Sequence, residues 1–463
     1  MRRWVLSIDQ NAISPPPAFR IRVAPPDHRT SLFIILIDAG ACLVIVCEVR
    51  VTHPTAPLSI PGLDTAPPLL PARVLEDDAQ ALQVAREFAA FAATHAAERD
   101  AERRLPWAEL ERFTTSGLGS IVVPRAFGGP GVSHVTIAEV FKLICAADPA
   151  LGQIPQNHFG ILRVLELAAT PEQQQRLLGS VLQGHRIGNA GPERNSRHTL
   201  ELRARASREG NGYRINGEKF YSTGALFAHW ITVKALDDDG EQVMAFVPRG
   251  TPGLRVIDDW SGFGQRTTAS GTVLLDNVPV PAQNIVRNGA LGQRPNTQGA
   301  YAQLIQAAID AGIAHAAVAD AIAFVRERAR PWPDAKVEAA RLEPYVIAEV
   351  GRLQVELEAA DALLERAAAT LDEVNALPVD EHSAARASIA VAEAKVLTTE
   401  IALKASEKLF ELAGSRATLA EHNLDRHWRN ARVHTLHDPV RWKVHAVGSF
   451  HLNGTHPARH SWI

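Results

Sequence analysis

Hydrophobic and polar positions change their spacing twice along the chain, and each change marks a boundary between predicted regions. From about residue 75 to residue 187 the pattern is helical. Residues 79–100 are rich in alanine with charged residues on one side, residues 107–116 follow Pro106, and residues 135–147 follow Ser133. Proline suits the first turn of a helix and serine is a favourable helix cap. We therefore predict that residues 75–187 form an N-terminal all-α domain.

Between residues 188 and 290 the apolar positions repeat every two residues. Apolar residues from Leu200 to Ala206 alternate with charged ones, and turns containing glycine and asparagine separate further short runs at 230–236, 243–247 and 272–275. Such alternation indicates strands with one buried face. Because no helix-length pattern separates the strands, we predict an antiparallel β-domain, a barrel or a sandwich, rather than a parallel nucleotide-binding sheet.

Helical spacing returns in residues 291–463. Apolar residues step by three and four from Leu304 to Val325, from Val350 to Leu371 and from Leu397 to Leu412. These rows are typical of helices that pack nearly antiparallel in a bundle. The fold class expected is therefore α+β and multidomain, ending in a four-helix bundle. Small alanines at many of these positions also suit packing between subunits, so we expect a homo-oligomer, a dimer or a tetramer.

Residues 1–74 differ from the rest, because proline-rich patches flank one apolar run at 31–49. Asp38 and Gly40 interrupt this run, and about thirty mixed residues precede it, so we expect neither a membrane span nor an export signal. The segment is interpreted as a poorly ordered extension, or as the product of a start codon assigned too far upstream. We place no chemistry there.

Composition excludes several classes of function. The 463 residues carry 48 Lys and Arg against 51 Asp and Glu, a net charge of −3, without a basic block suited to nucleic acid. The 3 cysteines lack the spacing of a zinc site or a disulfide framework, so we expect no metal and a reducing cytoplasm. The motifs of P-loop kinases, serine hydrolases and zinc proteases are missing, and residues 262–267 lack the third glycine of a dinucleotide fingerprint.

Sulfur is scarce in the chain, which has 2 methionines, Met1 and Met244, beside the 3 cysteines. Codon bias toward alanine and arginine is one interpretation, because leucine and isoleucine fill the same volume in a core. A protein made when sulfur is limiting is the other.

Several strings carry a resemblance to a known family. Residues 105–152, the string NGEKFYSTGA at 216–225 and the string GTVLLDNVPVPAQNIV at 271–286 resemble the acyl-CoA dehydrogenase superfamily of flavoproteins, in its helical domain and its β-domain. The strings GQIPQNHFG at 152–160 and RHWRNARVHTLHDPVRWK at 426–443 are closer to its flavin-dependent monooxygenase branch, the sulfur-acquisition oxidoreductases related to dibenzothiophene monooxygenase.

The position of the catalytic base separates the two branches. A dehydrogenase needs a carboxylate to remove the α-proton of its thioester substrate, and the superfamily usually carries it as glutamate near the C-terminus. This chain has His437-Asp438-Pro439 there, with a side chain one methylene shorter, and the alternative position at 301–304 holds no carboxylate. The resemblance therefore favours oxygenation over dehydrogenation.

The resemblance also implies roles for individual residues. His158 and His437 would donate hydrogen bonds to oxygen bound at the reduced flavin, and Asp438 would fix the tautomer of His437 or merely begin a turn. The residues implied to contact the flavin ring are Asn189, Phe220, Ser222 and Trp260. Arg328 and the turn at Gly414 and Ser415 would bind the phosphate, in this superfamily that of a neighbouring subunit's flavin.

Taken together, the resemblance implies a two-component flavin-dependent monooxygenase. A separate NADH-dependent reductase would supply reduced FMN, which with dioxygen would oxygenate a small organosulfur compound. Two alternatives stay open: an acyl-CoA dehydrogenase that uses FAD and an unconventional base, and a scaffold that binds flavin without turnover.

Overall fold

The computed structural model describes residues 34–38, 41–45, 65–198 and 200–463, and the chain divides into two units, residues 1–60 and 61–463. In the first unit, strand β1 (Ile34–Asp38) pairs antiparallel with strand β2 (Ala41–Ile45) inside the apolar run. Most of the extension predicted at 1–74 lies outside the described residues. Its end, from residue 65, is extended, and the amide of Arg73 donates to the carbonyl of Thr115 at 3.4 Å.

The second unit begins with the predicted helical domain. Its helices are α1 (Asp78–Ala93), α2 (Ala96–Glu102), α3 (Trp107–Thr115), α4 (His134–Ala147), α5 (Pro149–Gln153), α6 (Gln156–Ala168) and α7 (Pro171–Leu182). Ser133 caps α4 as predicted. The single helix expected at 79–100 is wrong, because the chain bends at Thr94 and His95, two weak helix formers. The bend turns Arg99 inward, where it pairs with Glu109 and Asp148.

The sheet of the central domain is mainly antiparallel. Its strands are β3 (Ile187–Ala190), β4 (Arg205–Glu209), β5 (Gly212–Lys219), β6 (Trp230–Asp237), β7 (Gln242–Pro248), β8 (Leu254–Ile257), β9 (Thr272–Pro281) and β10 (Ile285–Val286). They follow the order β10-β7-β6-β4-β5-β9-β8, and β3 pairs with β6.

Two pairs depart from the antiparallel prediction, because β3 and β4 both run parallel to β6. The long connection at 191–204 carries the chain back between β3 and β4, so both strands can follow the same direction beside β6. The alternating pattern also predicted too early a start for this strand. Strand β4 begins at Arg205, and Leu200 and Leu202 line a cavity instead.

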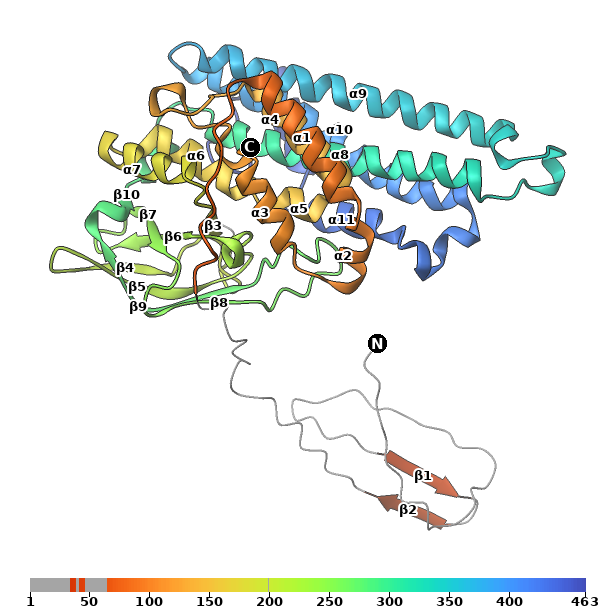
Figure 1. Ribbon diagram of the computed structural model, residues 1–463, viewed down its shortest axis with the longest axis horizontal. Coiled ribbons are helices and arrows are strands. Elements are labelled where there is room, and N and C mark those ends of the chain that lie inside the picture. The colour runs from red at the N-terminus through yellow and green to blue at the C-terminus, as the bar shows by residue number, and fades with distance from the viewer. Residues whose placement is uncertain (1–33, 39–40, 46–64, 199) are drawn as a thin grey trace. The chain divides into compact units, whose positions relative to one another are not determined.

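The C-terminal helices are long, as predicted. They are α8 (Gln298–Glu327), α9 (Pro344–Asn375), α10 (Glu381–Ala413), α11 (Asp425–His434) and α12 (Arg441–Asn453). Helices α8, α9 and α10 run side by side, with α4 against α8, and the sheet lies beyond the layer that contains α6 and α7 (Figure 1). Helix α8 is long and apolar enough to cross a membrane, but 67% of its apolar window is buried inside the protein.

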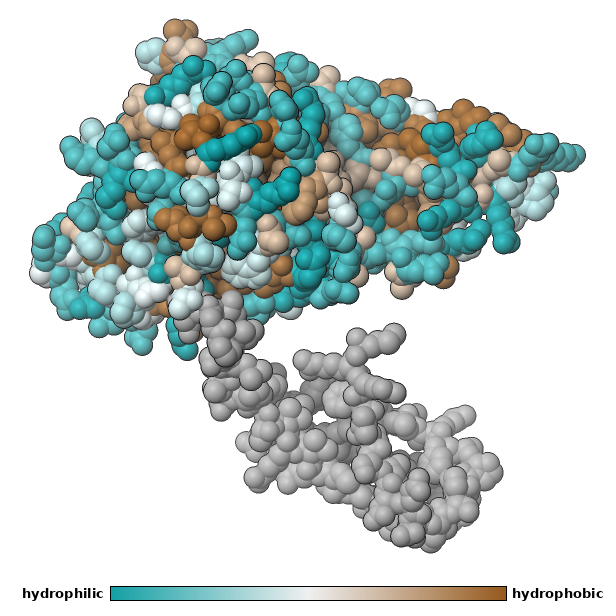
Figure 2. Space-filling model, in the orientation of Figure 1, coloured by the Kyte–Doolittle hydropathy of each residue, from teal (hydrophilic) through white to brown (hydrophobic). Residues whose placement is uncertain are grey.

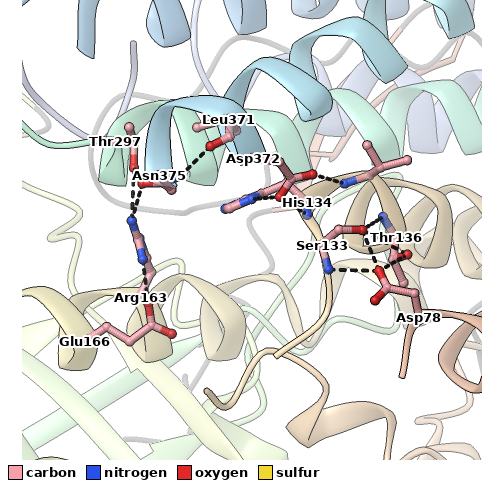
Figure 3. A network of polar contacts seen from close by, with 11 residues as sticks. Asp78, Ser133, His134, Thr136, Arg163, Glu166, Thr297, Leu371, Asp372 and Asn375 are labelled. Atoms are coloured by element: carbon pink, nitrogen blue, oxygen red, sulfur yellow. Dashed lines mark hydrogen bonds and ion pairs between the residues drawn. The ribbon is translucent and has the colours of Figure 1, made fainter. Parts of the chain in front are cut away.

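Polar contacts join the first helical domain to the bundle (Figure 3). The carboxylate of Asp372 on α9 accepts from the backbone amide of His134 at 2.8 Å and from its Nδ1 at 2.6 Å, and thereby caps α4. Burial by itself would raise the pKa of Asp372, but the hydrogen bonds from His134 outweigh it and lower the pKa. Nearby, Arg163 on α6 donates to Thr297 and to Asn375.

A buried charged cluster joins three helices of the bundle. Asp310 on α8 accepts from Lys395 at 2.7 Å and from Thr399 at 2.8 Å, both on α10, and lies 2.5 Å from Nδ1 of His434 on α11. All four side chains are buried. Burial would raise the pKa of Asp310, yet the Lys395 charge outweighs it and lowers the pKa to about 2. The carboxylate is therefore ionised and holds α11 against α8 and α10.

Helices α4 and α8 approach each other closely at Gly312. A Cβ atom at this position would lie 2.6 Å from the carbonyl oxygen of Lys142 and 2.7 Å from Cβ of Cys145. Because backbone cannot yield as a flexible side chain does, the two helices would have to move apart.

We expect Gly312→Ala to lower the free energy of unfolding by about 1–3 kcal/mol, since overpacking of a core has costs of this size. Urea denaturation measures the change. Gly351→Ala on α9 is the matched control, because a Cβ there meets nothing within 4 Å. That variant gains about 0.5–1 kcal/mol from helix propensity. Equal effects of the two substitutions would contradict the close approach of α4 and α8.

Candidate functional site

A cavity of about 830 Å³ lies between the β-domain and the helices, a size suited to a cofactor or a drug-sized ligand. Its walls come from α6, from the sheet, from the N-terminal part of α8, from the turn between α11 and α12 and from the segment 456–463. Asn189, Trp260 and His437, three of the residues predicted for the site, line this one cavity.

The wall from the β-domain is held by short polar contacts. The backbone amide of Asn189 donates to the carbonyl of Thr223 at 3.2 Å. Nε1 of Trp260 donates to the carbonyl of Gln265 at 2.9 Å. Tyr221 and Gln265 adopt left-handed backbone, with φ of 57° and 49°. Such conformations are costly for residues other than glycine and cluster at functional sites.

Two predicted contacts of the flavin ring, Phe220 and Ser222, lie just behind this wall. Phe220 is buried, with its ring 6.3 Å from that of Trp260, and the guanidinium of Arg194 covers it. The hydroxyl of Ser222 is buried and makes no hydrogen bond with the described residues, although its neighbours Tyr221 and Thr223 line the cavity. Phe220 therefore lies beside Trp260 and is not among the lining residues of the cavity.

The opposite wall presents His437. Its Nδ1 lies 3.1 Å from Oδ1 of Asp438, and its Nε2 lies 3.4 Å from the amide nitrogen of Gln306 on α8. Because a carboxylate only accepts, Nδ1 carries the proton of the neutral ring and Nε2 is the acceptor. The arrangement fixes both the tautomer and the orientation of His437.

Asp438 itself is buried and does not line the cavity. Its second oxygen pairs with Lys443 at 2.8 Å. Burial would raise the pKa of Asp438, but the hydrogen bond from His437 and the charges of Lys395 and Lys443 hold it well below its usual value. Asp438 is therefore a positioning residue. The described residues that line the cavity include one carboxylate side chain, Glu381, which pairs with Arg459.

The catalytic role predicted for His158 disagrees with its placement. His158 is buried on α6, where Nδ1 accepts from the amide of Ile187 at 3.1 Å and Nε2 donates to the carbonyl of Gly119 at 2.7 Å. Burial lowers its pKa to about 4. It borders a separate pocket of about 30 Å³. Both ring nitrogens are thus used to join α6, β3 and the loop after α3.

The predicted phosphate-binding residues lie together but far from the cavity. Arg328 follows α8, and its carbonyl accepts from Arg416 at 3.1 Å, next to Gly414 and Ser415; all four residues are exposed. Gln306 and Arg328 are 22 positions apart, which corresponds to about 33 Å of helix. One chain therefore cannot bring both ends of α8 to one mononucleotide.

Side-chain amides around the cavity were not predicted from the sequence. Seven glutamines line it, and four of them have a buried amide atom with no hydrogen-bond partner among the described residues: Gln153, Gln265, Gln303 and Gln306. Buried amides are costly unless they are paired, so they fit a planar ligand whose edge alternates donors and acceptors. The signal in the sequence was the pair of glutamines in the otherwise apolar start of α8.

Three family models match the chain in order. The N-terminal domain of acyl-CoA dehydrogenases matches residues 76–185, the middle domain matches 194–278 and the C-terminal domain matches 304–442. These matches correspond to the helical domain, the sheet and the bundle of the second unit.

Similar proteins have closely related folds. Dibenzothiophene monooxygenase of Rhodococcus erythropolis is 35% identical over 400 residues, which are 82% of this chain and 95% of that protein. FMN-bound TdsC from Paenibacillus sp. A11-2 is 31% identical, with a TM-score of 0.79 over 83% of this chain and 100% of its own. Methanesulfinate monooxygenase MsuC from Pseudomonas fluorescens is 32% identical, with a TM-score of 0.78 over 82% and 99%.

We expect His158→Ala to lower the free energy of unfolding by about 2–4 kcal/mol near neutral pH, because it leaves a buried amide and a buried carbonyl without partners. Chemical denaturation measures this. His95→Ala is the control, since His95 is exposed, and we expect it to change little.

The same interaction predicts a pH dependence. Because the pKa of His158 falls from 6.5 to about 4 on folding, the unfolded chain takes up the proton first. The contribution of His158 to the free energy of unfolding is complete above pH 6.5 and is lost as the pH falls toward 4. His158→Gln removes this contribution and flattens the profile over that range. An unchanged profile would contradict the structural role.

Proposed function

Because the chain belongs to the acyl-CoA dehydrogenase family, and within it to the flavin-dependent monooxygenases, we propose that it oxygenates a small organosulfur compound with reduced FMN and dioxygen. The observation that carries the proposal is the cavity itself. It combines amides that lack partners with a histidine of fixed tautomer, and its one carboxylate side chain among the described residues is already paired.

Residues of the cavity fit the flavin ring. The amides of Gln265, Gln303 and Gln306 supply donors and acceptors for its polar edge, and Trp260 offers an aromatic face. When bound, reduced FMN supplies the electrons that activate dioxygen.

His437 is the residue that handles protons at this site. Its Nε2 faces Gln306, so the ring accepts a hydrogen bond when neutral and donates one when protonated. The carboxylate of Asp438 lies 3.1 Å from Nδ1 and holds the ring in this orientation. The pair would therefore hold or pass on a proton at Nε2 of His437 without turning the ring.

Dehydrogenation is disfavoured by the same geometry. Asp438, at the position of the usual base, points to Lys443 and His437 behind the cavity wall, and position 303 holds a glutamine. The 2 methionines and 3 cysteines of the chain also suit a protein that serves sulfur acquisition.

The proposal also includes the source of the electrons and the oligomeric state of the protein. A separate NADH-dependent reductase delivers reduced FMN, and the chain works as a homo-oligomer, a dimer or a tetramer. Exposed apolar side chains support the second point: Tyr345 is 83% and Val355 is 70% exposed on α9. Figure 2 shows apolar side chains along the end of the bundle where α9 begins. In such an assembly, Arg328, Gly414 and Ser415 of one subunit bind the phosphate of the next subunit's FMN.

We expect His437→Ala to lower kcat/KM for FMN-dependent oxygenation about 10²-fold or more, as for loss of an acid–base residue. Oxygen uptake, released hydrogen peroxide and oxygenated product are measured together. Because the flavin still binds, peroxide release rises as product falls, and FMN affinity changes much less.

His95→Ala is the control, because His95 is exposed and is distant from His437 in the sequence. We expect it to keep the wild-type ratio of product to oxygen consumed. An unchanged ratio of product to oxygen consumed in His437→Ala would remove His437 from the mechanism. Anaerobic reduction of a bound flavin by an acyl-CoA would favour the dehydrogenase, and neither reaction in folded protein would favour the non-catalytic scaffold.

We expect Arg328→Ala to weaken FMN binding about tenfold and riboflavin binding hardly at all, because riboflavin lacks the phosphate. Fluorescence titration measures both affinities, and light scattering measures the mass of the assembly. An equal loss for both flavins, or a monomer that binds FMN as tightly as the assembly does, would contradict the phosphate site between subunits.

A further inference from the structure

Lys234 is a lysine on the cavity wall that belongs to none of the sequence motifs. It lies on β6 and lines the cavity, and across the sheet it pairs with Met244 of β7, another lining residue. On its other side is Gly191, where a Cβ atom would lie 3.4 Å from Cδ and 3.6 Å from Cε of Lys234. The aliphatic part of the lysine therefore packs against Gly191, in a side chain that lines the cavity.

No hydrogen bond or ion pair engages Lys234 within the described part of the chain. The carboxylate of Glu193, two residues after Gly191, is already occupied, because it accepts from Lys219 at 2.6 Å and from the backbone amides of Arg203 and Ala204. Arg459, the other lysine or arginine among the described residues that line the cavity, pairs with Glu381. Burial lowers the pKa of Lys234, as expected for an ammonium without a counter-charge.

Asn189 stands beside this lysine. A Cβ atom at Gly191 would lie 3.0 Å from Oδ1 of Asn189, so Asn189 and Lys234 flank the same bare glycine. The oxygen of the Asn189 amide that faces this point only accepts, so the donor available here to the oxygens of an anion is the ammonium of Lys234.

We infer that Lys234 is the anion-binding group of the cavity and holds the negatively charged end of a sulfinate or sulfonate substrate. This inference rests on the proposed function, and narrows its substrate class from organosulfur compounds in general to anionic ones. The phosphate of FMN is a second source of the same oxyanion chemistry. We favour the substrate, because Arg328 and its neighbours already offer an exposed phosphate site.

The experiment measures binding to the full chain by calorimetry, with methanesulfonate and methanesulfonamide as probes. The two molecules match in size and tetrahedral sulfur but differ in charge. We expect Lys234→Met to weaken methanesulfonate binding about tenfold or more and to leave methanesulfonamide within about threefold. Lys234→Arg, which keeps the charge, restores methanesulfonate binding. Lys336→Met is the matched control on an exposed lysine.

Equal binding of methanesulfonate to wild type and Lys234→Met in folded protein would overturn the inference, and so would a wild type that does not prefer the sulfonate. Loss of FMN but not riboflavin affinity in Lys234→Met would support the anion site and assign it to the cofactor. If the wild type prefers methanesulfonate but catalyses no FMN-dependent oxygenation, the proposed function fails and the anion site stands.

Discussion

The position of the site depends on one buried carboxylate. Asp310 meets Lys395 and His434 inside the bundle, and thereby holds α11 against α8 and α10. Helix α11 in turn positions the loop of the β-domain, because Asn430 accepts from the amide of Gln265 at 2.6 Å. Removing one partner of a buried ion pair costs about 3–5 kcal/mol, because an uncompensated charge remains. His437 follows α11. Its position therefore depends on buried charges that lie outside the cavity.

Polarity is distributed between structure and ligand in a consistent way. Buried charges that serve the fold are paired, as Arg99 is with Glu109 and Asp148. By contrast, the glutamines and Lys234 at the cavity have hydrogen-bonding capacity that the described chain does not use. Unpaired polar groups cost stability in the free protein and contribute to affinity when a ligand satisfies them. The unpaired polar groups of the cavity thus lower the stability of the free protein and strengthen the binding of a ligand.

Periodicity alone predicted the helical regions and the bundle, because a buried helical face repeats every three to four residues. Strand direction was not predictable from alternation, since β3 and β4 alternate in the same way whether they run parallel or antiparallel to β6. The motif resemblance predicted Asn189, Trp260 and His437 as site residues, and the structure places all three on the wall of one cavity. It misplaced His158, because a motif does not show which nitrogens are already bonded. Lys234 belongs to no motif, and its place on the cavity wall follows only from the fold.

Helix α8 carries the cavity amides near its first turns and Arg328 just past its last. In the proposed assembly each FMN is shared by two chains, so dilution of the enzyme releases cofactor before any helix unfolds. Flavin occupancy then reports the association state of the protein. Substitutions on the exposed face of α9, far from the reacting atoms, will register as defects in cofactor retention.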